Sequence, residues 1–235
     1  EAVPGSRELS AVNYYTGETV KIPLDPTLTA QENAKKYFDR YGKLKRTYEA
    51  LEHLIKETKE EIQHLESIST ALDIALNEED LVQVKEELTQ YGYIRRKYTG
   101  KRVKITSKPF HYLSSDGYDI YVGKNNYQND ELTFKMATGN DWWFHAKDMP
   151  GSHVIVKTND KELPDRTFEE AAALAAYYSA AGNAKSDEQA KIEVDYVRRK
   201  ELKKPPKANP GLVIYHTNYS LIANTDISAL KKADE

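Results

Sequence analysis

The feature that most limits the fold of this chain is a heptad repeat in its first third. Apolar and aromatic side chains dominate positions that recur at alternating steps of four and three residues over five heptads, the spacing of a coiled-coil seam. The seam consists of Tyr37, Tyr41, Leu44, Tyr48, Leu51, Ile55, Thr58, Ile62, Leu65, Ser69, Leu72 and Leu76. No proline breaks the run, and Gly42 is its only glycine. The repeat predicts one long helix that begins near residue 30.

A second, shorter helix is predicted directly after the first. Asn77 ends the long helix, an acidic triplet opens the next one, and Gly92 is a natural stop. The seam of the short helix is Leu81, Val84, Leu88 and Tyr91. These residues are too few to cover the long seam, so we expect a partner for most of it, either an upstream arm of the coil or a second copy of the chain. The alternative is a solvated single helix held by i,i+4 pairs.

The charge of the chain is unevenly distributed along its length. The formal net charge is -3, and residues 30–92 carry nine Lys/Arg against fourteen Asp/Glu, so any basic surface lies outside the coil.

The chain has no cysteine, which excludes disulfides and thiolate zinc sites. It has no apolar run of the roughly 18 to 20 residues that span a bilayer. Residues 1–10 resemble no signal peptide, and residues 230–235 carry no anchor pattern, so we expect a cytoplasmic protein. The chain starts without Met and we interpret it as a fragment, which leaves an upstream signal open.

Strand signals flank the helices. A hairpin is expected at the start, with strands at 12–15 and 19–22 around a turn that contains Gly17, and Thr27 or Thr29 can cap the long helix. Later segments with strand patterns, separated by turn residues, lie at 110–113, 118–122, 142–146, 153–157, 192–197, 212–215 and 221–222. An alanine-rich helix is expected at 168–181, ended by Gly182. The predicted fold is α+β, with long coiled-coil helices followed by a small mixed α/β domain.

Five segments follow from this pattern. They are a β-hairpin segment at 1–28, coiled-coil helices at 29–94, a basic linker at 95–109, an α+β domain at 110–225 and a C-terminal tail at 226–235.

Two basic segments and an aromatic strand are the candidate RNA-binding residues. Phosphate binding needs cations, and bases stack on flat side chains. The candidates are Arg95, Arg96, Lys97, Lys101, Arg102, Lys104, Trp142, Trp143, His145, Lys147, Arg198, Arg199, Lys203, Lys204 and Lys207. Alternation along a strand puts Trp142 and Trp143 on opposite faces, so we expect one in the core and the other within reach of a ligand. The equally good alternative is that neither contacts a ligand, because a large aromatic residue in a small domain usually belongs to the core. The first basic run has an equally good interpretation as a solvated linker.

Catalysis finds little support. The six histidines form no His-Glu-x-x-His motif, and no metal trio can be assembled. Ser152 and His153 are adjacent, which points their side chains to opposite faces of a strand. Glycine-rich phosphate loops are absent from the sequence. We therefore expect no catalytic residues, no metal and no cofactor, and a protein that is not an enzyme.

Several motifs resemble the NFACT family, which includes RqcH and fibronectin-binding protein A-like proteins. Its NFACT-R module is resembled by the motifs at 114–118, 120–125, 141–148 and 150–154. Its middle coil is resembled by those at 22–29, 33–38 and 41–45, and its C-terminal loop and strand by those at 203–207 and 210–213. The match covers nearly the whole chain in the right order.

The resemblance implies a binding protein. In one branch, members bind the large ribosomal subunit and tRNA and support the addition of C-terminal alanine tails, which implies a cytoplasmic, ribosome-associated quality-control factor. Other members are described as fibronectin- or fibrinogen-binding adhesins at the cell surface without a signal or anchor, and this alternative stays open. The first arm of the antiparallel coil, which the resemblance places upstream, would cover the open seam.

Overall fold

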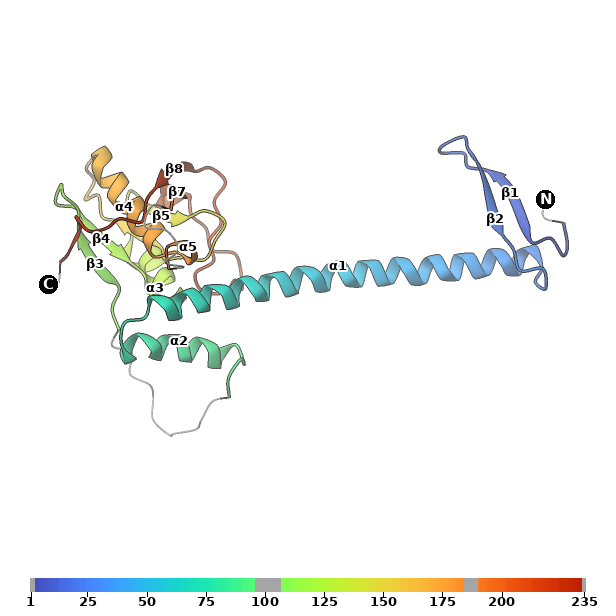
Figure 1. The fold of residues 1–235 in the computed structure, drawn as a ribbon, viewed down its shortest axis with the longest axis horizontal. Helices are drawn as coiled ribbons and strands as arrows, with labels where there is room; N and C mark the ends of the chain where they lie inside the picture. The colour runs from blue at the N-terminus through green and yellow to red at the C-terminus, as the bar shows by residue number, and fades with distance from the viewer. Residues whose placement is uncertain (1–2, 96–106, 184–189, 234–235) are drawn as a thin grey trace. The chain divides into compact units, whose positions relative to one another are not determined.

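A computed structural model describes residues 3–95, 107–183 and 190–233 of the chain, which divides into two compact units, residues 1–60 and 61–235. The first unit holds a two-stranded sheet (Figure 1). Strand β1 (Glu8–Val12) pairs antiparallel with β2 (Thr19–Pro23). The first strand lies earlier than the predicted 12–15, because the Asn13 side chain accepts a hydrogen bond from the Tyr15 N–H (3.0 Å) and turns the chain.

Helix α1 (Ala30–Ile74) starts with a capping box at Thr29, one of the two predicted cap residues. The Thr29 N–H donates to Glu32 (2.8 Å) and the Glu32 N–H donates to the Thr29 hydroxyl (3.3 Å), which satisfies two free donors at the helix start. The Tyr37 hydroxyl donates to the carbonyl of Pro23 (2.6 Å) and attaches the hairpin to the helix.

The seam of α1 is exposed along its whole length. All twelve seam residues are exposed, including Leu51 at 49% and Ile62 at 49%; eleven lie in α1 and Leu76 lies just after its end. The single helix from Ala30 to Ile74 confirms the long helix that the repeat predicts. The coiled coil stays a prediction, because no described residue covers the seam.

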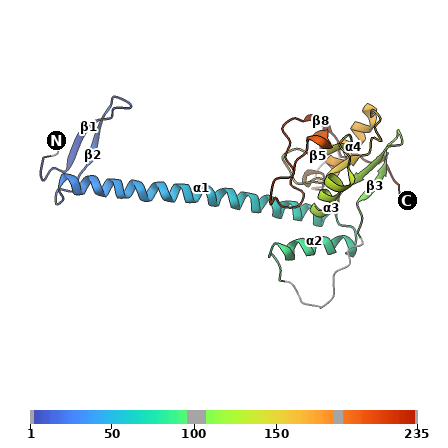
Figure 2. The ribbon, with the colours of Figure 1, turned by 180° about the vertical axis from the view of Figure 1, so that it is seen from behind.

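In the second unit, helix α2 (Glu78–Gln90) packs on the last turns of α1, as Figures 1 and 2 show from opposite sides. Asn77 caps α2 by accepting from the Asp80 N–H (3.0 Å), and Gly92 follows its end with a left-handed φ of 79°. Ile68 and Ala71 of α1 form the buried contact with Val84. Neither is a seam residue, so α2 lies beside the predicted seam and leaves it open.

The rest of the unit is built on one antiparallel sheet in the order β8-β7-β5-β6-β4-β3-β9. Its strands are β3 (Phe110–Leu113), β4 (Asp119–Val122), β5 (Trp142–Ala146), β6 (Val154–Val156), β7 (Ile192–Arg198), β8 (Tyr219–Ala223) and β9 (Lys231–Lys232). Each pairs antiparallel with its neighbours. In register, Trp142 lies opposite Arg198 and Tyr196 lies opposite Tyr219.

Helices cover both faces of this sheet. Helix α4 (Asp165–Tyr177) packs on β4 to β8 and buries the larger core, which contains Phe144, Val154 and Leu174; the short α5 (Ala180–Asn183) follows it. The other face carries α3 (Asn126–Glu131), a π-helical turn η1 (Leu132–Met136) and part of the segment from 202 to 215. The second core contains Leu132 and Trp143.

Most predicted elements of this domain are confirmed, with three differences. The segment 212–215 is not a strand and makes one isolated bridge, from Ile214 to Lys203. The alanine-rich helix begins earlier than predicted and stops at Tyr177, and Gly182 lies inside α5, where a Cβ would lie 2.3 Å from the Tyr177 carbonyl oxygen. The sequence pattern missed α3, η1, the single 3₁₀ turn η2 (Arg199–Glu201) and the short β9.

Candidate nucleic-acid interface

Asp141 organises the end of β5 at which the candidate site lies. Its buried carboxylate accepts hydrogen bonds from the Thr138 N–H (2.7 Å), the Thr158 N–H (2.9 Å) and the Lys157 amine (2.5 Å). Burial raises the pKa of Asp141, but the bonds from Lys157, Thr138 and Thr158 outweigh it and hold the pKa below its ordinary value. Asp141 therefore fixes the turn before the strand and neutralises Lys157.

The two tryptophans lie on opposite faces of the sheet, as alternation predicts. Trp143 has no exposed surface and belongs to the second core, against Leu132 and Val197. Trp142 is partly exposed on the α4 face, where its ring lies 5.0 Å from Phe168 of α4. The structure makes Trp143 a core residue and leaves Trp142 as the tryptophan that a ligand can reach.

His145 is a largely buried histidine beside His153, whose Nδ1 is hydrogen-bonded to the Thr133 hydroxyl (2.7 Å). Burial lowers the pKa of His145 to about 4 and holds the pKa of His153 well below its ordinary value. Both rings are therefore neutral near pH 7 and supply no charge for a phosphate.

Arg198 ends β7 and Arg199 starts η2, the turn that follows, with their guanidinium groups on opposite faces of the sheet. Arg198 lies 4.1 Å from the centre of the Trp142 ring and donates to the carbonyl of Asn140. Arg199 lies 5.2 Å from the centre of the Phe134 ring and donates to the carbonyl of Thr133 (2.8 Å). Each guanidinium is held on an aromatic ring by one hydrogen bond and has further N–H donors to offer a phosphate.

The lysine-rich loop after β7 is fixed to α3 through Asp130. The Asp130 carboxylate pairs with the Lys204 amine and accepts from the Gly211 N–H (3.0 Å). The charge of Lys204 is therefore already compensated. Lys203 and Lys207 are exposed, and Lys207 has a left-handed φ of 60°.

The remaining candidates lie apart from this cluster. Lys147 directly follows the other end of β5, where its amine donates to the Glu193 carboxylate (2.6 Å), and this hydrogen bond raises the pKa of Lys147. Arg95 is exposed just after α2. The predicted contacts Arg96, Lys97, Lys101, Arg102 and Lys104 lie outside the described residues.

The sequence did not reveal Phe134 or Asp130, which help to build the cluster. Both belong to the missed α3 and η1 helices. One signal was present: Asn125 accepts from the Gln128 N–H (3.0 Å), and an Asn followed three residues later by Gln is a helix-start pattern.

A buried polar joint connects this domain to α2. On α2, Asp80 accepts from the Lys124 amine (2.9 Å), and Glu87 accepts from the Asn126 amide (2.9 Å) and is paired with His64 of α1 (2.9 Å). Glu87 has no exposed surface, and its Oε2 bonds to no residue in the described ranges. Burial raises the pKa of Asp80, but hydrogen bonds, including that from Lys124, outweigh it and keep the pKa below its ordinary value. The joint fixes α3, and through it Asp130, relative to the helix pair.

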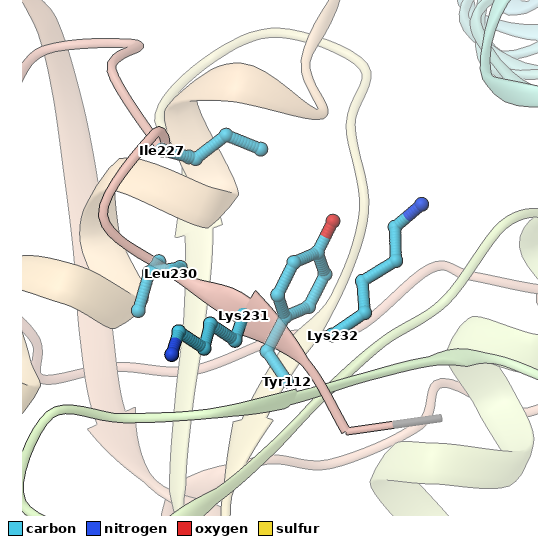
Figure 3. Close-up of a pocket in the computed structure, with 5 residues that line it drawn as sticks. All are labelled: Tyr112, Ile227, Leu230, Lys231 and Lys232. Atoms are coloured by element: carbon cyan, nitrogen blue, oxygen red, sulfur yellow. The ribbon is translucent and has the colours of Figure 1, made fainter. Parts of the chain in front are cut away.

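A separate cavity of about 370 Å³ lies at the far edge of the sheet, between β3 and the C-terminal segment (Figure 3). It is lined by Tyr112, Ile227, Leu230, Lys231 and Lys232. Figure 3 shows the Tyr112 hydroxyl and the Lys232 amine on one side, with Lys231 pointing the other way. The Tyr112 hydroxyl is already hydrogen-bonded to that of Tyr178 (2.6 Å), and the lining residues that the structure describes include no carboxylate or imidazole.

Within the three described ranges, no group of three or more histidine or acidic side chains is placed to hold a metal ion. Among the same residues, no helix has the length and apolar character needed to cross a membrane.

The sheet domain is an α+β module with cations at one strand end and an aromatic ring beside each of Arg198 and Arg199, the chemical groups that nucleic-acid binding requires. Residues 1–107 match the family described as NFACT N-terminal and middle domains, and residues 108–217 match the NFACT protein RNA binding domain. The chain belongs to the NFACT family.

Relatives of known description agree with this family. The chain is 45% identical over 210 residues to the Rqc2 homolog RqcH of Streptococcus suis, which covers 89% of this chain and 37% of the relative. It is 30% identical over 162 residues to the ribosome quality control complex subunit NEMF of Mus musculus, which covers 66% of this chain and 13% of the relative. The chain thus spans well under half the length of these relatives.

One solved structure is similar over most of the chain. It is described as the C-terminal of the fibronectin/fibrinogen-binding protein from Streptococcus suis. The TM-score is 0.76 at 41% sequence identity, and the match covers 87% of this chain and 80% of that one.

Proposed function

We propose that this chain is the RNA-binding C-terminal part of a cytoplasmic, ribosome-associated quality-control factor. Its relatives include proteins described as RqcH and as a ribosome quality control complex subunit, and its sheet domain matches an RNA-binding family. The finer role is binding of the large ribosomal subunit and tRNA in support of C-terminal alanine tailing, in which the parts of the relatives that this chain does not span would also take part.

The observation that carries the proposal is the arrangement at the end of β7. Arg198 and Arg199 each lie on an aromatic ring, on the two faces of the sheet, and exposed Lys200, Lys203 and Lys207 follow within nine residues. In this segment Glu201 is the only acidic residue. Cations for phosphates beside flat groups for bases are what single-stranded RNA binding requires.

The direct test is a charge reversal that spares the structural lysine. Changing Lys200, Lys203 and Lys207 together to Glu removes three exposed charges and leaves the Lys204–Asp130 pair intact. RNA affinity is expected to fall for every RNA sequence, and the slope of log affinity against log salt should flatten by roughly 0.7 to 0.9 for each phosphate that is no longer neutralised. The matched control changes Lys43, Arg46 and Lys56 of α1, all exposed on its polar side, to Glu.

Co-sedimentation with separated ribosomal subunits, run with the same two variants, tests the ribosomal part of the proposal. We expect the chain to sediment with the large subunit and the reversed variant to stay in the supernatant. Equal sedimentation of the two variants would show that this loop does not bind the ribosome.

An adhesin role is the second candidate, because the solved structure with the same fold is described as a fibronectin/fibrinogen-binding protein. Fibronectin and fibrinogen binding to the immobilised chain can be measured with the same variants and salt series. Binding that is insensitive to salt and to the lysine changes, with no RNA binding, would favour the adhesin role.

A further inference from the structure

Tyr219 is an exposed aromatic residue on an outer strand of the sheet. It starts β8, and 64% of its surface is exposed. Its ring is nevertheless fixed: it stacks on Tyr196 of β7 with centroids 5.5 Å apart and an angle of 27° between the planes. The Trp142 ring lies 6.4 Å away, edge to face. The Tyr219 ring is therefore held in place by its neighbours and still presents a large aromatic surface to solvent.

A cation lies on the same face of the sheet. Arg198 is two positions after Tyr196 on β7, so both side chains point to the α4 face, about 7 Å apart along the strand. The Arg198 guanidinium lies on Trp142, next to these tyrosines. The exposed tyrosine and the arginine therefore form adjacent flat groups, one neutral and one cationic.

We propose that Tyr219 is a base-stacking residue that binds an unpaired nucleotide of RNA, with Arg198 contacting the adjoining phosphate. This inference rests on the proposed RNA-binding function and adds to it the residue and the form of RNA. The bases of a duplex are stacked on one another, whereas an unpaired base has a free face that an aromatic ring can cover. Stacking platforms on the surface of a sheet are a known mode of single-stranded RNA binding.

A purely structural role for Tyr219 makes a different prediction. Tyrosine is favoured in strands, and an exposed tyrosine on an outer strand needs no ligand to explain it. In that case, truncation changes stability slightly and leaves RNA binding unchanged. The two interpretations thus differ in a measurable quantity.

The test measures the affinity of the full 235-residue chain for a 12-nucleotide oligouridylate and for a blunt RNA duplex by fluorescence anisotropy at several salt concentrations. Tyr219→Ala is expected to weaken oligouridylate binding by about 5- to 150-fold, the range that one base stack is worth. The salt slope should not change, because every cation that neutralises a phosphate is retained. Binding of the duplex should stay within about twofold of wild type, because its bases are already stacked on one another.

Three further variants isolate the ring. Tyr219→Phe keeps the stacking surface and should bind as wild type does. Tyr219→Leu retains an apolar contact with Tyr196 and should weaken binding as much as Tyr219→Ala, which separates stacking from any loss of folding. Ile222→Ala is the matched control, since Ile222 is 70% exposed on the same strand but faces the other side, and it should have no effect.

The outcomes separate this inference from the function on which it rests. If the lysine-reversed variant loses RNA binding while Tyr219→Ala binds oligouridylate like wild type, the stacking role is wrong and the RNA-binding function stands. If Tyr219→Ala weakens duplex and single strand equally, the specificity for unpaired RNA is wrong. If the wild-type chain binds neither RNA, both proposals fail.

Discussion

Arg198 lies directly opposite Trp142 in the pairing of β7 with β5, and its guanidinium is 4.1 Å from the centre of the indole ring. The pair combines a cation–π contact with a hydrogen bond from Arg198 to the Asn140 carbonyl. The geometry holds the charge at the sheet end where the lysine-rich loop begins. Residues that oppose each other in a sheet have the closest side chains, so the register of two strands sets this arrangement.

Two replacements of Arg198 should distinguish the effect of its positive charge on RNA binding from the effect of its flat guanidinium group on stability. Arg198→Lys keeps the charge but replaces the flat guanidinium, so we expect the free energy of unfolding to fall by about 0.5 to 1 kcal/mol while the salt slope of RNA binding is retained. Arg198→Ala should also reduce that slope by roughly 0.7 to 0.9. Salt titrations of RNA binding and urea unfolding measure the two effects. Arg166→Ala, at an exposed arginine of α4 paired with Glu170, is the control; an equal slope in Arg198→Ala and Arg166→Ala would contradict the phosphate role.

Glu87 should matter more for stability than any exposed residue of α2. Glu87→Ala leaves the buried groups of His64 and Asn126 without their shared acceptor, which costs about 1 to 3 kcal/mol of unfolding free energy. Lys85→Ala, at an exposed position of the same helix, should change it by less than about 0.5 kcal/mol. Denaturant unfolding followed by circular dichroism provides the comparison. Similar values for the two variants would show that the polar joint does not stabilise the folded domain.

Acid should destabilise the sheet domain through its buried histidines. The pKa of a histidine in the unfolded chain is about 6.5. In the folded protein the pKa of His145 is about 4, and that of His153 is also lowered. Between these pH values the unfolded state binds more protons. The free energy of unfolding therefore falls as the pH falls, by up to about 1.4 kcal/mol per pH unit for each histidine.

Denaturant unfolding at pH 7, 6 and 5 measures this dependence. The double change His145→Gln and His153→Gln should flatten it, and His216→Gln, at an exposed histidine, should not. A double variant with the wild-type dependence would assign the acid sensitivity to other groups.

The exposed seam of α1 should make the chain associate with itself. Burial of Leu51, Ile55 and Ile62 between two copies removes apolar surface from water, and placing Glu at all three positions should give a monomer. Analytical ultracentrifugation from low to high micromolar concentration measures this. The Lys43, Arg46 and Lys56 variant introduces as many glutamates on the polar side of the helix and should associate like wild type. A wild-type chain that stays monomeric at high micromolar concentration would contradict the prediction.

The helices and strands that could be predicted from the sequence are those whose own residues show a regular hydrophobic spacing. The strands at 110–113 and 142–146 alternate, and α1 has a sustained heptad spacing, so local chemistry was sufficient. It was not sufficient for α3, whose buried residues are the polar Asn126, Gln128 and Asn129, with partners that include residues of α2. A polar run is typical of a surface loop until its distant partners are known.

The same limit applies to the candidate site. Alternation placed Trp142 and Trp143 on opposite faces, but only the packing of η1 decides that Trp143 is the core residue. The basic loop was visible in the sequence, whereas the pairing of Lys204 with Asp130, 74 residues earlier in the chain, was not. Tyr219 gave no signal, because it lies before the predicted strand at 221–222 and a single tyrosine there is ordinary.

The position of α2 on α1 has a consequence for any helix that covers the exposed seam. Successive residues of a helix are about 100° apart around its axis, and α2 packs on Ile68 and Ala71, one position before the exposed seam residues Ser69 and Leu72. A helix that covered the seam here would therefore be a direct neighbour of α2 as well as of α1. The last turns of α1 would then form a three-helix bundle with α2 and the partner helix.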